Sequence, residues 1–241
     1  MLERSAKLSA IPGLKHGFTN RLGGVSTGAF DSLNLGLKWG DDPEAVAENL
    51  KRVADAGGYP PRTLRRVNQV HRGDVVRATS LNDASEADGL WCTRDDRVTA
   101  AVSTADCVPI LLANTEGTVA AAVHSGWRST VAGIAGAAVD SLGVDPATVV
   151  AAIGPCIEQA RFEVGPEVAA QFDGAFVDVT SYAKPHIDLV AVVTEQLRKA
   201  GVLVSNIERV GTCTHAHPER YFSYRRDGAG TGQMMSFVGY A

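Results

Sequence analysis

The segment VTAAVSTADCVPILLANTEGTVAAAVHS, Val98–Ser125, carries the clearest information about the fold. It contains three apolar runs, at residues 98–103, 110–113 and 118–123, and short polar turns separate them. The second run and most of the third have no polar residue, a pattern that is typical of β-strands covered on both faces. The segment therefore predicts buried β-strands at the centre of the protein.

Further strands and three helices are predicted on both sides of this segment. Short β-branched runs occur at 67–70, 75–77, 149–153, 176–179, 207–210 and 234–238. Apolar residues spaced three and four apart predict helices from Asp42-Pro43 to Gly57, from Val131 to Leu142, and from Ile187 to Ala200. Strands and helices alternate irregularly, so we expect a mixed α/β (α+β) fold, a layered sandwich of mixed β-sheets flanked by helices.

The composition is that of a globular protein. Of 241 residues, 45% are hydrophobic and 21% are charged, and the formal net charge is −4. These values exclude disordered and collagen-like chains and give no electrostatic reason to expect a nucleic-acid or membrane partner. Without an internal repeat or a linker, residues 1–241 are expected to form one domain. Because we see no secretory signal and no apolar run of membrane length, we expect a cytoplasmic protein with its four cysteines reduced.

Three residues at the ends of predicted strands are candidates for chemistry: His71, Cys107 and His124. Two imidazoles and one thiolate suit Zn²⁺, and three protein ligands would leave the fourth position open for water or substrate. The same residues also fit a metal-free site, with Cys107 as nucleophile and His71 or His124 as base. That alternative would be a thiol hydrolase acting on an amide.

A second cluster of possible ligands is Cys213-Thr-His215-Ala-His217. In an extended segment, residues at alternating positions share one face, so Cys213, His215 and His217 could reach one metal ion. This cluster is the alternative to His71, Cys107 and His124 as the metal site.

Two polar, glycine-rich segments, 19–40 and 213–232, show no helix or strand pattern and are expected to be functional loops. Arg21 in the first and the Arg225–Arg226 pair in the second are candidates for binding phosphate through guanidinium and backbone N–H groups. Neighbouring aromatic residues could stack on a nucleoside base, and they are Tyr221, Phe222 and Tyr224.

Eight sequence blocks together resemble the YfiH family, also called laccase-domain, DUF152 or peptidoglycan-editing-factor proteins. The blocks are FTNRLGGVS (18–26), SLNLG (32–36), NQVH (68–71), TADCVP (104–109), HSGWR (124–128), IGPC (153–156), FEVGPE (162–167) and FSYRRDG (222–228). The resemblance covers nearly the whole chain from His16 onward. Ser125 and Ser129 depart from the alanine and glycine that are usual in the family.

The resemblance implies a YfiH-like sandwich and a zinc ion held by His71, Cys107 and His124. It implies phosphorolysis of adenosine, inosine, guanosine and methylthioadenosine to free base and (methylthio)ribose 1-phosphate, with adenosine deamination as a further activity. Purine nucleoside and phosphate are thus the expected partners, and the chain is expected to be a monomer or a small homo-oligomer. His215 and His217 lie outside the family pattern, so we treat them as local variation.

Two further expectations follow. Asp106, next to Cys107, is predicted to orient a histidine ligand as its hydrogen-bond partner. Family members have also been called copper-dependent polyphenol oxidases, so copper is the alternative metal. The sequence favours zinc over this reading because it lacks the several histidine clusters and the axial methionine pattern of oxygen-reducing copper sites.

Overall fold

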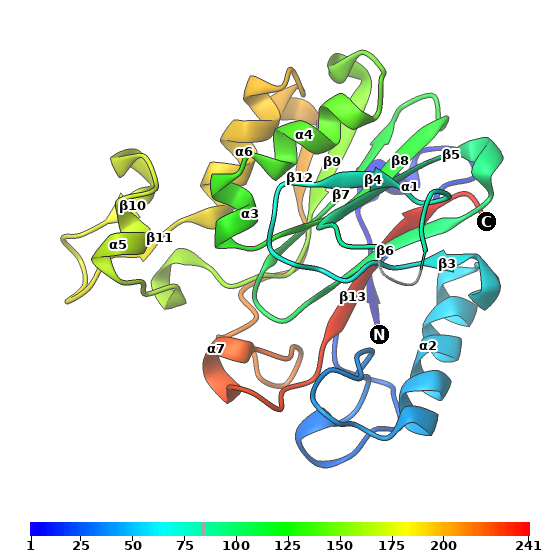
Figure 1. Ribbon diagram of the computed structural model, residues 1–241, viewed down its shortest axis with the longest axis horizontal. Helices are drawn as coiled ribbons and strands as arrows, with labels where there is room; N and C mark the ends of the chain where they lie inside the picture. The colour runs from blue at the N-terminus through cyan, green and yellow to red at the C-terminus, as the bar shows by residue number, and fades with distance from the viewer. Residues whose placement is uncertain (83–84) are drawn as a thin grey trace.

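Two β-sheets lie face to face in the computed structural model, which describes residues 1–82 and 85–241 (Figure 1). The five-stranded sheet has the order β1 (Leu2–Glu3), β2 (Lys15–Thr19), β13 (Met234–Gly239), β6 (Thr99–Thr104) and β3 (Leu64–Arg65). The six-stranded sheet has the order β12 (Ile207–Arg209), β9 (Val149–Ile153), β7 (Val108–Asn114), β8 (Val119–Ser125), β5 (Gly89–Thr93) and β4 (Val75–Arg77). A separate hairpin joins β10 (Val177–Asp178) to β11 (His186–Ile187).

Helices cover the outer faces of both sheets. The described helices are α1 (Ala6–Ser9), α2 (Pro43–Gly57), α3 (Trp127–Val131), α4 (Ile134–Ser141), α5 (Pro166–Ala169), α6 (Leu189–Lys199) and α7 (Tyr224–Asp227). Figure 1 shows α2 on one side of the molecule and α3, α4 and α6 on the other. Both sheets contain parallel and antiparallel pairs, since β3 joins β6, β12 joins β9 and β4 joins β5 in parallel. The predicted sandwich of mixed sheets flanked by helices is confirmed.

The apolar runs of the central segment are explained by burial on both faces. Along β7, Ile110 and Leu112 pack into the core beneath α4 and α6, whereas Leu111 and Ala113 pack between the two sheets. The outer face of the five-stranded sheet packs against α2 in a third cluster that includes Val53. Each residue of β7 and β8 is therefore buried, whichever way its side chain points.

The helix predictions are confirmed for α2 and α6, and the second predicted helix is divided. The side chain of Asp42 accepts a hydrogen bond from the Glu44 backbone at the start of α2, and Gly58 ends the helix in the left-handed conformation. The helix expected to begin at Val131 consists instead of α3 and α4. Gly133, with a φ of 80°, separates them, because this backbone conformation cannot continue a right-handed helix.

The strand predictions hold for β6, β7, β8, β9 and β13 and for the edge strands β4 and β12, but they miss two interior strands, β2 and β5. Residues 67–70 do not form a named strand, and their segment makes only a single bridge, between Asn68 and Glu86. Strand β2 was not predicted, because its sequence KHGFT has no apolar pattern. Its burial comes from the neighbouring strand: a β-carbon on Gly17 would lie 3.0 Å from the Phe237 ring. None of the described helices is long and apolar enough to cross a membrane.

Candidate active site

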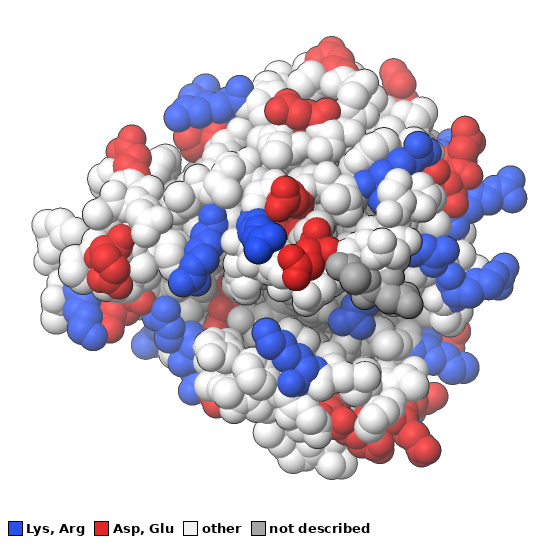
Figure 2. Space-filling model, in the orientation of Figure 1, with Lys and Arg blue, Asp and Glu red and all other residues white. Residues whose placement is uncertain are grey.

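A cavity of about 780 Å³ opens where β6 turns into β7 and where β8 ends. This volume falls within the range that is usual for small-molecule sites. Its lining includes all three dispersed candidates, His71, Cys107 and His124. Figure 2 shows acidic and basic side chains interspersed around a hollow near the centre of the view, without a broad patch of one sign.

The three candidates converge. One nitrogen of each histidine and the Cys107 sulfur all lie within 4.8 Å of one another. Cys107 occupies the turn between β6 and β7, and His124 is the penultimate residue of β8. His71 lies in a loop, where its φ of 59° places it in the left-handed region. It therefore does not follow a strand, as the sequence had suggested.

One buried carboxylate, that of Asp88, organises two of these residues. Its Oδ1 lies 2.7 Å from Nδ1 of His124, so this histidine presents Nε2 on the other side of its ring. Its Oδ2 accepts hydrogen bonds from the backbone N–H groups of Val70, at 3.3 Å, and Arg72, at 2.6 Å. Asp88 thus fixes both the His124 ring and the loop that carries His71. No motif or spacing in the sequence marks this residue.

Gly126 leaves room for the other two side chains. A β-carbon at this position would lie 2.6 Å from His71 Nδ1 and 3.1 Å from Cys107 Sγ. Both distances are shorter than ordinary van der Waals contact. The first turn of α3 can therefore approach the donor atoms only because residue 126 has no side chain.

The electrostatics of the group are those of interacting donors. Burial and the neighbouring His124 lower the pKa of His71, which keeps this imidazole neutral and able to bind a metal. Burial lowers the pKa of His124, but the neighbouring Cys107 and Asp88 side chains outweigh this effect and raise the pKa to about 9. Two imidazole nitrogens and one sulfur that converge in this way suit a tetrahedral ion such as Zn²⁺, and they also suit copper.

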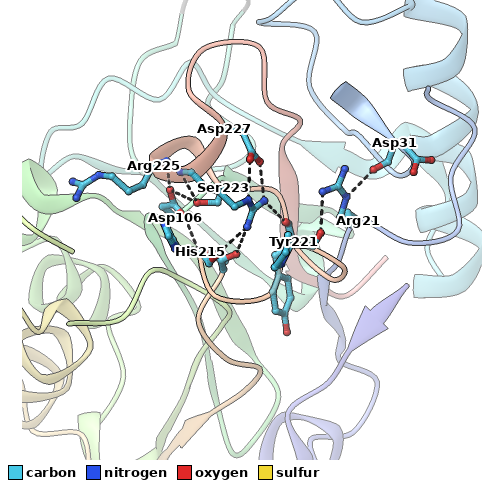
Figure 3. Close-up of polar contacts among 11 residues, drawn as sticks. Arg21, Asp31, Asp106, His215, Tyr221, Ser223, Arg225 and Asp227 are labelled. Atoms are coloured by element: carbon cyan, nitrogen blue, oxygen red, sulfur yellow. Dashed lines mark hydrogen bonds and ion pairs between the residues drawn. The ribbon is translucent and has the colours of Figure 1, made fainter. Parts of the chain in front are cut away.

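Asp106 has a different place from the one predicted. Its carboxylate accepts hydrogen bonds from the Thr214 hydroxyl, at 2.5 Å, the Ser223 hydroxyl, at 3.0 Å, and the Arg225 backbone N–H, at 2.6 Å (Figure 3). It therefore ties the 213–225 segment to the turn that carries Cys107. The carboxylate that contacts a histidine of the group is that of Asp88.

The three predicted phosphate-binding arginines do not converge. Arg21 donates two hydrogen bonds to backbone carbonyls, and Arg226 donates to three further carbonyls and to the Asp227 carboxylate. Of the three, Arg225 alone lines the cavity, and it also donates to the Glu163 carbonyl. Figure 3 shows the Arg225 side chain extending away from the network around Asp106. Arg21 and Arg226 thus hold loop backbone in place.

The aromatic side chains near Arg225 and Arg226 differ in their exposure. Tyr221 and Phe222 are fully buried and cannot stack on a ligand, so this part of the expectation is wrong. Tyr224 is half exposed and lines the cavity. Its ring stacks on that of Trp39, with centroids 6.0 Å apart and an interplanar angle of 28°. Trp39 also lines the cavity, although the sequence analysis did not select it.

The competing cluster does not form a ligand group. Cys213 is buried beside Cys156, with which it forms an isolated β-bridge, whereas the His217 side chain is 43% exposed and lies 3.1 Å from the Glu219 carboxylate. Among residues 1–82 and 85–241, only His71, Cys107 and His124 form a group of three or more ligand side chains close enough to hold one metal ion. All four cysteines have free thiols.

The fold and the site together define a mixed α/β protein with a His/Cys/His metal-ligand group in a small-molecule cavity. The family model described as multi-copper polyphenol oxidoreductase laccase matches residues 15–241, and the chain belongs to this family. The family resemblance deduced from the sequence blocks is thereby confirmed.

Two named relatives and two solved structures are similar to this chain over nearly its full length. The Escherichia coli protein named purine nucleoside phosphorylase YfiH is 38% identical over 223 residues, which is 91% of each chain. A Deinococcus radiodurans protein named purine nucleoside phosphorylase is 38% identical over 241 residues, 95% of this chain and 89% of that one. The structure of a Neisseria meningitidis DUF152 protein has a TM-score of 0.88 at 34% identity and covers 99% of this chain and 98% of that chain. YlmD from Geobacillus stearothermophilus has a TM-score of 0.86 at 30% identity, covering 95% and 93%.

Proposed function

We propose that this protein is a purine nucleoside phosphorylase. Its reaction would join inorganic phosphate to the anomeric carbon of the ribose as the bond to the purine nitrogen breaks, giving free base and ribose 1-phosphate. The observation that carries the proposal is the cavity of about 780 Å³ around the His/Cys/His group, in a chain whose relatives bear this name. We include adenosine, inosine, guanosine and methylthioadenosine among its substrates.

The metal in this proposal is zinc, held by His71, Cys107 and His124. Borderline-soft nitrogen and sulfur donors, with one donor fewer than a closed tetrahedral site, support this choice. When bound, zinc supplies a Lewis acid with one open coordination position. The single group of three donors in the described ranges also favours a one-metal site over a multi-copper oxidase, which needs several metal centres.

The chain's own residues have distinct roles in this proposal. Asp88 orients His124 and holds the His71 loop, so the donor atoms keep their spacing while substrate enters. Tyr224 and Trp39 offer aromatic faces to the purine at the cavity wall. Arg225 contributes positive charge to the same cavity. Because Cys107 and the two histidines would bind the metal, none of them would be free to act as nucleophile or base, which disfavours the thiol hydrolase.

The test of the proposal is an assay of purified protein with inosine and adenosine, each with and without phosphate. We expect free base and ribose 1-phosphate in equal amounts, and only when phosphate is present. Base release that is equally fast without phosphate would show a hydrolase instead. Conversion of adenosine to inosine in the same reactions would reveal the deaminase activity that the open coordination position also permits. Phenol oxidation with copper and no nucleoside turnover would favour the oxidase.

A further inference from the structure

Arg66 lies in the wall of the same cavity and is fixed to a strand of the five-stranded sheet. One guanidinium nitrogen donates to the Ser103 hydroxyl at 2.8 Å. Gln69 holds the same residue from the other side: its amide donates to the Ser103 carbonyl at 2.8 Å and accepts from the Ser103 N–H at 2.7 Å. Ser103 belongs to β6, the strand that leads into Cys107. The Arg66 guanidinium therefore has a defined position relative to the metal-ligand group.

The charge of Arg66 has no anionic partner. Within the described part of the chain, its hydrogen-bond acceptor is a neutral hydroxyl and no carboxylate pairs with it. A guanidinium has five N–H donors, so most of those on Arg66 remain available. Arg66 is solvent-exposed as a residue and lines the cavity, and desolvation by the surrounding protein lowers the pKa of its guanidinium. A cation in such surroundings is stabilised when a ligand brings an anion to it.

Among the other arginines near the cavity, Arg226 pairs with the Asp227 carboxylate, whereas Arg21 and Arg225 are held by backbone carbonyls of loops and not by a strand. Lys38 adds a further positive charge to the cavity lining, close enough to His71 to lower the pKa of that histidine after the effects of burial and His124. The cavity thus combines a metal-ligand group with positive charge whose counterion the protein does not provide.

We infer that Arg66 is the principal phosphate-binding side chain of the cavity, presenting its guanidinium fork to inorganic phosphate while Ser103, itself fixed by Gln69, holds it in place. This inference rests on the proposed function and specifies the residue that serves its second substrate. A planar fork binds two phosphate oxygens at once, a geometry that lysine cannot reproduce. Arg66 is consequently a binding residue for the phosphate and has no contact role toward the purine.

The experiment compares R66Q and R66K with R62Q, a control that removes an exposed arginine outside the cavity. For R66Q we expect the KM for phosphate to rise by about tenfold or more while the KM for inosine stays within about twofold. R66K should give an intermediate rise, and R62Q should behave as the wild type. S103A, which keeps the arginine but removes its anchor, should raise the KM for phosphate less than R66Q does.

Direct titration with inorganic phosphate, without nucleoside, separates this inference from the proposed function. We expect the heat of phosphate binding to the metal-loaded wild type to be lost in R66Q and retained in R62Q. If the wild type cleaved nucleosides without phosphate, the proposed function would fail, and the titration would still test Arg66. Unchanged phosphate binding in R66Q, or equal increases in both KM values, would overturn the inference. Tight binding of inosine 5′-monophosphate with none of phosphate would overturn it too, by assigning Arg66 to a nucleotide.

Discussion

Two regions of this protein contain the same kinds of side chain and use them differently. His71, Cys107 and His124 come from a loop, a turn and a strand, and their donor atoms lie within 4.8 Å of one another. Cys213 and His217 are only four positions apart in sequence, yet Cys213 is buried beside Cys156 and His217 is partly exposed and pairs with Glu219. Proximity along the chain therefore does not create a ligand group, whereas convergence at the end of a sheet does.

The carboxylates of the two regions explain the difference. Asp88 accepts hydrogen bonds from the loop around His71 and pairs with the ring of His124, so it arranges donor atoms around a space. Asp106 accepts hydrogen bonds from Thr214, Ser223 and the Arg225 backbone, so it ties the 213–225 segment to the turn that carries Cys107. One carboxylate organises a site and the other organises a segment of backbone.

The strongest test of this comparison removes histidines from each region. H124A should lose nearly all bound metal and nearly all phosphorolysis, because two remaining ligands and a missing buried partner for Asp88 cannot hold the ion. The double variant H215A/H217A should keep its metal and its activity. Elemental analysis of both purified proteins gives the answer, and metal loss confined to the double variant would reverse our assignment.

Next in size is the effect of the organising carboxylate. D88N should weaken metal binding by about 10- to 100-fold, because the amide cannot accept from two backbone groups and also pair with His124 in the same way. The matched control is E116Q, an exposed acid in the turn between β7 and β8, before the start of the strand whose far end carries His124. Competition with a chelator measures the affinities. An unchanged affinity in D88N would remove Asp88 from the site.

A smaller effect is expected when the loop carboxylate is changed. D106N should lower the free energy of unfolding by about 1–3 kcal/mol, since an amide cannot accept all three hydrogen bonds that the carboxylate accepts. Metal content should stay near that of the wild type. Urea denaturation and elemental analysis of the same sample test both statements, and metal loss at unchanged stability would contradict the separation of roles.

The smallest effect concerns a buried histidine in neither region. Burial, with the nearby Arg4, lowers the pKa of His16 to about 4, below the ordinary value of 6.5. The unfolded chain therefore binds the proton more readily, and the stability that neutral His16 contributes is lost as the pH falls from 6.5 towards 4. Between pH 7.5 and 5.5 the loss attributable to His16 is about 1 kcal/mol. Urea denaturation of wild type and H16Q at both pH values should show a smaller loss in the variant.

The parts of the fold that sequence predicts are those where local chemistry and tertiary burial agree. Helix α2 has a capping aspartate, a proline at its first position and a glycine at its end, all within its own sequence. Strands β7 and β8 are apolar because both faces are buried. Strand β2 has no such pattern, and its glycine is buried by Phe237, more than 200 residues away in the printed sequence.

The candidate site also has a part that the sequence predicts and a part that it does not. The metal-ligand group could be selected from residue type and family resemblance, but its supporting residues could not. Asp88 acts on His124 across 36 residues and Arg66 on Ser103 across 37, so no local pattern connects them. The sequence shows three aromatics near Arg225, and only packing decides that Tyr221 and Phe222 point into the core while Tyr224 faces the cavity.

The position of Asp88 also has a consequence for the order of events during folding. This residue directly precedes β5, and β5 pairs with β8, the strand that carries His124. The backbone on both sides of His71 is bound to Asp88, and this contact forms only once these strands have paired. Metal capture at this site is thus a late event that follows assembly of the six-stranded sheet, and an emerging polypeptide presents no preformed pair of ligands to trap an ion prematurely.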